Sequence, residues 1–177
     1  MATHVKSILL ILSLGLVSFP SSTVAQREAK KFADVGEANC DNIKGYLDYL
    51  ADLLHNDPTT KAYIIFYGGR IGYGSKKRLP KRGEAEARVS FWRSYLIHTR
   101  DVEPARIEVV CGGYRERLIV ELWVVPSGVS PPNPTPTLTE KDIKFRRGKP
   151  KSIDLFGEDD CGIVEGGITT PCKSTTK

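Results

Sequence analysis

The sequence predicts an α+β fold, a two-layer sandwich with the element order (β)αβαββ and a proline-rich carboxyl-terminal tail. Two observations support this prediction. Residues 39–56 and 83–100 carry apolar side chains at helical spacing. Short runs rich in β-branched and aromatic residues lie between and after them, which is typical of strands. Because helices alternate with strands along the chain, we expect two helices on one face of a small mixed sheet.

The first two elements are a short strand and a long helix. Residues 31–36 are the candidate strand. In the helix that follows, Asn39 or Asp41 is the expected cap, since a short polar side chain can accept a hydrogen bond from a free backbone N–H. Pro58 ends the helix, because the residue before a proline avoids helical geometry. The apolar face of this helix consists of Ile43, Leu47, Leu50 and Leu54.

A basic loop separates the next strand from the second helix. The run 61–67 (KAYIIFY) is almost continuously apolar, which predicts a strand buried on both faces and ended by Gly68 and Gly69. The second helix is expected over about 83–100. Its predicted buried face consists of Ala85, Val89, Trp92 and Leu96.

Two more strands are predicted at 107–111 and 117–125. The residues between them, 112–116 (GGYRE), suit the turn of a hairpin, so we expect the two strands to pair. Glu121 alternates with apolar neighbours, so one face of the second strand is expected to be partly wet.

The two ends of the chain lie outside this domain. Lys6, the apolar run 8–17 and the small residues before Gln26 are typical of a cleaved secretory signal peptide, so we expect a periplasmic or secreted protein. No later run is apolar for the roughly 18 residues that a membrane helix needs. The predicted organisation is a signal peptide at 1–25, a domain at 26–125, a proline-rich linker at 126–139 and a tail at 140–177.

The sequence contains four cysteines, Cys40, Cys111, Cys161 and Cys172. None belongs to a CxxC pair, which disfavours a zinc site, and export makes disulfides the expected state. Of three possible connectivities we favour Cys40–Cys111 with Cys161–Cys172. If the first strand is a parallel neighbour of the second, Cys40 and Cys111 both lie at the carboxyl edge of the sheet. The other bond would close a loop in the tail.

Positive charge is concentrated in the loop after the strand 61–67. The chain has a formal net charge of +5, and six cations fall within 70–82, beside glycines that let backbone N–H groups approach a ligand. Candidate ligands are peptidoglycan carboxylates, envelope phosphates and an acidic partner protein; a solvated loop is the alternative. We expect no nucleic-acid partner. The cations are Arg70, Lys76, Lys77, Arg78, Lys81 and Arg82.

Arg88, near the start of the second helix, is the candidate ligand-gripping residue. A guanidinium can hold a carboxylate with two parallel hydrogen bonds, and the amino end of a helix favours anions. The alternative is an ion pair with Glu84, four residues earlier. Tyr73 and Tyr114, in predicted loops, are the aromatic residues free to contact a ligand. The predicted ligand-binding set is Arg88, Gly69, Arg70, Lys76, Lys77 and Arg78.

Three segments resemble the OmpA-like domain, the peptidoglycan-binding module of Gram-negative envelopes. They are NDPTTKAYIIFYGG (56–69), RVSFWRSYL (88–96) and DVEPARIEVVCGGY (101–114), and the resemblance covers about 32–125. The pieces YGGR, RGEA, GGYRE and VELW, with the proline-rich tail, are similar to a group of secreted bacterial proteins.

The resemblance implies a carboxylate-binding site. In the OmpA-like family an aspartate after the strand and an arginine on the second helix grip the stem peptide of peptidoglycan. Arg88 stands at the place of that arginine, whereas Gly69 stands at the place of the aspartate. The family's NxxLS before the arginine is replaced, with Lys81, Glu84 and Ala85 in this stretch.

These observations predict a non-catalytic exported domain that binds peptidoglycan or another anionic envelope component through Arg88 and the loop 70–82. The alternative is a structural or protein-interaction subunit that keeps the fold as a scaffold and docks a partner through 126–177. His55 and His98 lie near helix ends, outside any metal or nucleophile motif, so an enzyme is disfavoured and no cofactor is expected.

Overall fold

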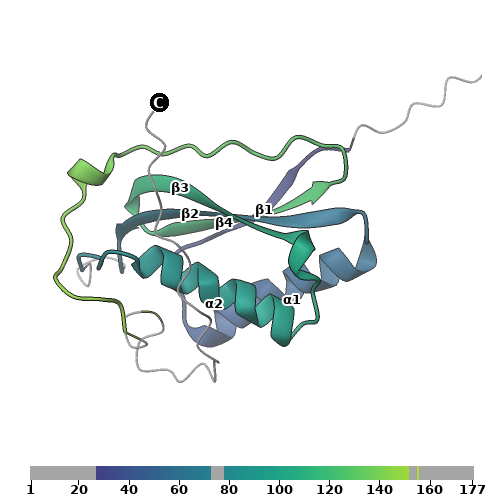
Figure 1. Cartoon of the computed structure of the whole chain (residues 1–177), viewed down its shortest axis with the longest axis horizontal. Helices are drawn as coiled ribbons and strands as arrows, with labels where there is room; N and C mark the ends of the chain where they lie inside the picture. Colours follow the sequence, from purple (N-terminus) through teal and green to yellow (C-terminus); the bar gives the residue numbers. More distant parts are fainter. Residues whose placement is uncertain (1–26, 73–77, 152–154, 156–177) are drawn as a thin grey trace, which may run out of the picture.

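Two helices cover one face of a four-stranded sheet, as the sequence predicts (Figure 1). The computed structural model describes residues 27–72 and 78–151, together with Leu155. The element order confirms the predicted α+β arrangement. The elements are β1 (Lys30–Val35), α1 (Cys40–Asn56), β2 (Thr60–Arg70), α2 (Glu84–His98), η2 (Pro104–Arg106), β3 (Ile107–Arg117), β4 (Ile119–Pro126) and η3 (Glu140–Asp142).

The sheet has the strand order β1-β4-β2-β3, so the predicted hairpin is wrong. β2 lies between β3 and β4, parallel to the first and antiparallel to the second. The residues 112–116 do not form a turn. They continue β3 to Arg117, and irregular register with β2 after Phe66 accommodates the extra residues.

The chain passes from β3 to β4 directly over the end of β2. The N–H of Leu118 donates to the carbonyl oxygen of Arg70 at 3.0 Å. A Cβ atom at Gly69 would lie only 2.3 Å from the carbonyl carbon of Arg117, so only glycine permits this crossing. β2 therefore continues through the glycines to Arg70 instead of ending at Gly68.

Both helices bury an apolar side against the sheet. Asn39 caps α1, because its side-chain oxygen accepts a hydrogen bond of 2.9 Å from the N–H of Asn42. α2 follows Gly83, whose φ of 79° lies in the left-handed region that favours glycine. The predicted buried residues of both helices are confirmed: Ile43, Leu47, Leu50, Leu54, Ala85, Val89, Trp92 and Leu96.

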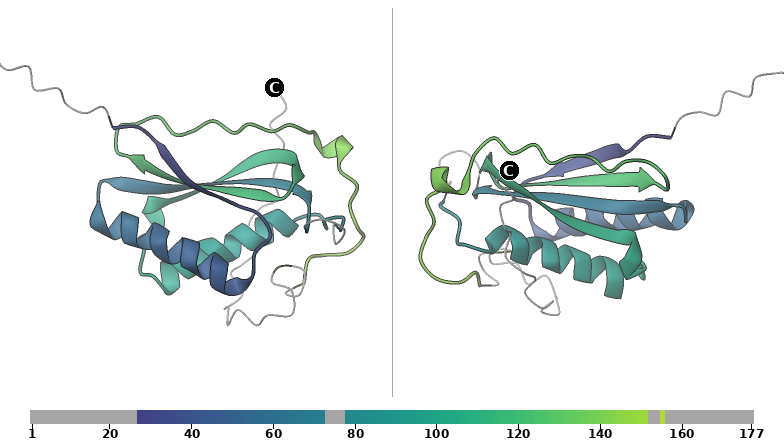
Figure 2. Two further views of the ribbon diagram at one scale, coloured as in Figure 1. Left: turned by 180° about the vertical axis from the view of Figure 1, so that it is seen from behind. Right: turned by 45° about the horizontal axis from the view of Figure 1, so that its top comes forward.

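Residues 127–151 follow β4 and are called the tail from here on; their first part lies across the face of the sheet that the helices leave open (Figure 2). The N–H of Thr135 donates to the hydroxyl of Tyr67 at 3.0 Å. The N–H groups of Thr137 and Leu138 both donate to the carbonyl oxygen of Tyr114 at 3.0 Å. The predicted linker is thus packed on the domain over much of its length.

Cys40 and Cys111 are both disulfide-bonded. The premise for joining them to each other is wrong, because β1 pairs with β4 and is no neighbour of β2. That connectivity stays a prediction, and the Cys161–Cys172 loop and the signal peptide lie outside the described residues. No helix in the described ranges is long and apolar enough to cross a membrane.

Candidate functional site

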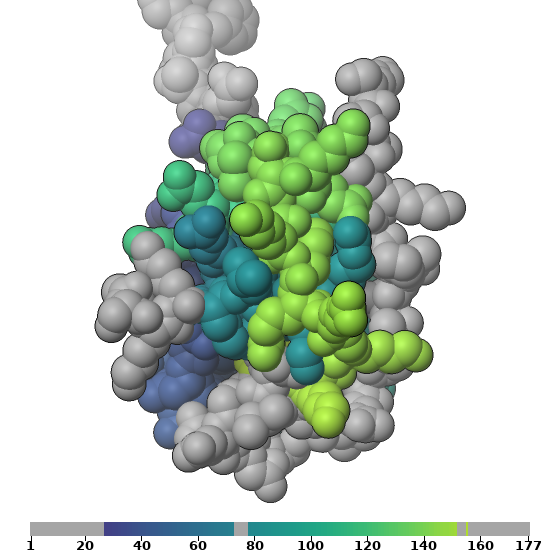
Figure 3. Space-filling model, turned by 90° about the vertical axis from the view of Figure 1, so that its left-hand side faces the viewer, coloured from purple at the N-terminus to yellow at the C-terminus, as the bar shows by residue number. Residues whose placement is uncertain are grey.

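The candidate site lies at the end of the sheet where β2 and β3 finish. Figure 3 looks onto this end, where the tail, in light green, lies across the residues that end β2. The N–H of Arg146 donates to the carbonyl oxygen of Pro80 at 2.8 Å, which fastens the tail beside the start of α2. Of the predicted site residues, Lys76 and Lys77 lie outside the described ranges, as does Tyr73.

Glu84 forms the centre of a buried charge cluster at the start of α2. Its two carboxylate oxygens accept hydrogen bonds from both terminal nitrogens of Arg78, at 2.9 and 2.5 Å. The backbone N–H of Lys81 adds a third bond of 3.0 Å. Arg88, which is 3% exposed, donates to Glu84 Oε1 at 3.4 Å.

Arg88 is therefore engaged inside the protein, and the ion pair with Glu84 that the sequence left open is present. Burial lowers the pKa of Arg88, and the negative charge of Glu84 opposes that shift. Arg78, another predicted ligand residue, shares the same carboxylate. Glu84 thus occupies the kind of grip that the resemblance assigns to a ligand carboxylate.

Gly69 is buried beneath the crossing from β3 to β4. Its missing side chain makes room for the backbone of Arg115 and Arg117. The close approach that the sequence predicts at this glycine is therefore made by the protein's own chain. Gly68 is similar, since a Cβ atom there would lie 2.8 Å from the ring of Tyr114.

Arg70 borders a cavity of about 340 Å³ between the ends of β2 and β3 and the tail. This cavity is called the cationic pocket below. Arg70 and Arg117 are direct partners in the pairing of β2 with β3, and both side chains are exposed. Like charges on neighbouring strands repel each other. The cationic pocket is lined by Arg70, Leu79, Glu116, Arg117, Leu138, Asp142, Ile143 and Lys144.

The cations of this pocket have no direct ion-pair partner in the part of the chain that the structure describes. The side chains of Arg70, Arg117 and Lys144 take part in no ion pair or hydrogen bond there. Asp142 is directed to its own turn, where its carboxylate accepts bonds from the hydroxyl and the N–H of Thr139 at 2.7 and 2.8 Å. These bonds lower the pKa of Asp142, so it is charged at neutral pH.

A second cavity, of about 320 Å³, lies between the glycines of β2 and the start of α2. Tyr114 and Phe145 line it and contact each other edge to face, with ring centroids 6.1 Å apart. Burial raises the pKa of Tyr114, and Glu86 adds to the shift. Three carboxylates and two cations line this cavity, so it is less suited to an anion: Glu84, Glu86, Glu140, Lys81 and Arg82.

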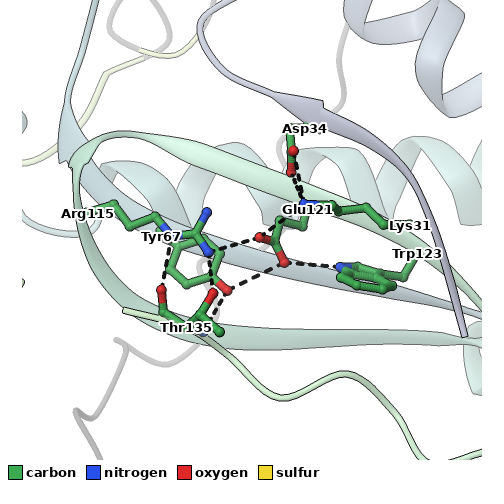
Figure 4. Close-up of polar contacts among 7 residues, drawn as sticks. All are labelled: Lys31, Asp34, Tyr67, Arg115, Glu121, Trp123 and Thr135. Carbon is green, nitrogen blue, oxygen red and sulfur yellow. Dashed lines mark hydrogen bonds and ion pairs between the residues drawn. The ribbon is translucent and has the colours of Figure 1, made fainter. Parts of the chain in front are cut away.

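A further buried carboxylate, Glu121, lies on the opposite face of the sheet under the tail (Figure 4). Arg115 Nη2 donates to its Oε1 at 2.9 Å, and the indole N–H of Trp123 donates to its Oε2 at 3.1 Å. The hydroxyl of Tyr67 lies 3.5 Å from the same Oε2. Arg115 also stacks 3.6 Å above the Tyr67 ring and binds Thr135 of the tail at 2.6 Å.

Glu121 is 4% exposed, so the face that the sequence predicts to be partly wet is covered at this residue, while Ile119 and Trp123 on the same face of β4 are half-buried. Lys31 Nζ lies 3.7 Å from Glu121, and its hydrogen bond to Asp34, with the charge of Glu121 adding, raises the pKa of Lys31. Every oxygen of Glu121 has a partner, which makes this cluster an anchor for the tail. Lys31 and Tyr67 lie far from Glu121 in the sequence, so the lone glutamate in an apolar strand is the signal for this cluster.

The described residues contain no group of three or more His, Cys, Asp or Glu that could hold a metal ion. His55 and His98 are both exposed, in the last turns of α1 and α2. No family model and no curated protein sequence matches the chain.

Proposed function

We propose that this protein is a non-catalytic exported domain that binds an anionic component of the cell envelope, with peptidoglycan carboxylates as the first candidate. The observation that carries the proposal is the exposed pair Arg70 and Arg117, side by side at the rim of a cavity. An anion between them would relieve their repulsion, and a guanidinium can hold a carboxylate with two hydrogen bonds.

The ligand contact then lies at the ends of β2 and β3, at Arg70 and Arg117, and not at Arg88 as the sequence suggests. Arg88 and Arg78 are held by Glu84, so gripping a ligand would require breaking a buried ion pair. Arg70 needs no such rearrangement. The resemblance to the OmpA-like domain supports a carboxylate as the class of ligand. The facing pair Arg70 and Arg117 supports the ends of β2 and β3 as the binding site.

The ligand side of the proposal is tested by co-sedimentation of the mature protein with purified peptidoglycan. In a matched sample of peptidoglycan, the carboxylates of the polymer are converted chemically to amides. We expect pelleting with the untreated polymer alone, and less of it as salt rises, because exposed charges are screened beyond about 10 Å at 0.1 M salt. Equal pelleting with the amidated polymer would contradict the proposal.

The second candidate function is a structural or protein-interaction subunit built on the same fold. It is favoured by the internal engagement of Arg78 and Arg88, which leaves the family-type grip closed. Tyr46 and Tyr49, which are 42% and 55% exposed on α1, would offer a protein partner aromatic contacts. A stoichiometric envelope protein that copurifies with the full chain, and is lost in the Tyr46→Ala/Tyr49→Ala variant, would support this function. Copurification unchanged by that variant would remove α1 as the interface.

A further inference from the structure

We propose that the cationic pocket binds a carboxylate that bears a short aliphatic group. The inference rests on the proposed function, from which it takes the anionic class of the ligand. It adds the size of the ligand, its charge and an apolar part. At about 340 Å³ the cavity lies at the small end of the range of ligand pockets. A small molecule, or the end of a chain, fits that volume.

The charges of the pocket favour a single negative charge on the ligand. Three cations, Arg70, Arg117 and Lys144, and two carboxylates, Glu116 and Asp142, line the pocket, which gives it a formal excess of one positive charge. A carboxylate balances that excess, whereas a doubly charged phosphate would exceed it. The planar guanidinium groups also match the two oxygens of a carboxylate.

The other wall of the pocket is apolar. Leu79, Leu138 and Ile143 line it, and Leu79 is 36% exposed, one of the few large apolar side chains so open to solvent among the described residues. Water in contact with this wall would be displaced by an aliphatic group, which is favourable because it removes apolar surface from water. A ligand with both a charged and an apolar part therefore fits the pocket better than acetate or an uncharged molecule.

The tail builds half of this site. Leu138, Asp142, Ile143 and Lys144 all come from it, and it is fixed on β3 by the hydrogen bond from Leu138 N–H to the carbonyl oxygen of Tyr114. The turn that follows is closed by Asp142 on Thr139. The pocket thus exists only while residues 138–144 are docked, which gives the packed tail a role in binding.

The test is an amide ¹H–¹⁵N NMR titration of the mature chain with hexanoate, hexanamide and acetate at neutral pH. Hexanoate is expected to shift signals of residues lining the pocket and to bind at least about tenfold tighter than either analogue. Arg70→Ala should weaken hexanoate about tenfold, and Ile143→Ala should weaken hexanoate but leave acetate unchanged. Lys61→Ala, which removes an exposed cation at the other end of β2, should change neither.

Equal binding of hexanoate and hexanamide, or shifts confined to other surfaces, would overturn the inference. The amide spectrum of each variant also reports whether it is folded. If peptidoglycan pellets with the protein but hexanoate does not bind, the inference fails and the proposed function stands. If hexanoate binds in the pocket but peptidoglycan does not pellet, the proposed function fails and the pocket stands.

Discussion

At the scale of single residues, three buried charges, Glu84, Arg88 and Glu121, distinguish this domain from an ordinary apolar core. The sequence predicts the Glu84–Arg88 ion pair as one of two possibilities, because four residues separate them on one helix. It does not predict that Arg78 joins them, since its position depends on how the chain returns from β2 to α2. Spacing along the sequence predicts ion-pair partners within one helix. Ion pairs between different elements can be predicted only once the tertiary structure is known.

Glu84→Gln is expected to destabilise the protein by about 3 to 5 kcal/mol. The substitution keeps the shape of the side chain but removes the negative charge that the buried guanidinium of Arg88 and the guanidinium of Arg78 both contact. Urea unfolding at neutral pH measures the effect. Glu108→Gln, at an exposed position in β3, is the matched control and should change stability little. Equal stability of the two variants would refute a structural role for the cluster.

Glu121→Gln is expected to cost about 2 kcal/mol, because the carboxylate loses charge-assisted hydrogen bonds to Arg115 and its ion pair with Lys31. Trp123 fluorescence gives a second measurement, since its indole N–H donates to Glu121. The emission spectrum of the folded variant should shift relative to the wild type. An unaltered spectrum together with unaltered stability would contradict the arrangement in Figure 4.

At the scale of elements, the sequence predicts which segments are helices and strands but not which strands are neighbours. The pair 107–111 and 117–125 has the spacing of a hairpin, yet β2 separates β3 from β4. The reason lies in glycines whose partners are remote: Gly69 lets the chain cross β2, and Gly112 receives the ring of Tyr67. Such contacts leave no periodic pattern in the sequence, so residues 112–116 are most simply interpreted as a turn.

Gly112→Ala is expected to destabilise the protein by about 1 to 3 kcal/mol. Its Cβ atom would lie 2.4 Å from the ring of Tyr67, which is fully buried and cannot retreat without disturbing the contact with Thr135. Gly45→Ala on α1 is the control, since its Cβ atom would meet nothing within 4 Å. That variant should be more stable than the wild type by about 0.5 to 1 kcal/mol. Thermal unfolding of both variants measures the contrast, and a tolerated Gly112→Ala would refute the close packing.

At the scale of the whole molecule, the tail is part of the domain surface instead of a free spacer. Its composition, rich in proline and poor in large apolar residues, predicts an extended chain, and the chain is extended. Composition does not reveal that an extended segment is held by Tyr67, Tyr114 and Arg115. For the same reason the sequence predicts a basic surface at 70–82 but not the pairing of Arg70 with Arg117.

Two charge-matched double variants, compared in the peptidoglycan co-sedimentation assay, test directly whether Arg70 and Arg117 bind the ligand. Arg70→Ala/Arg117→Ala removes the facing pair, and Lys30→Ala/Lys61→Ala removes two exposed cations at the opposite end of the sheet. We expect the first variant to lose pelleting at low salt while the second keeps it. Equal loss in both would show that binding follows net charge alone, and retention by the arginine variant would contradict a site at the ends of β2 and β3.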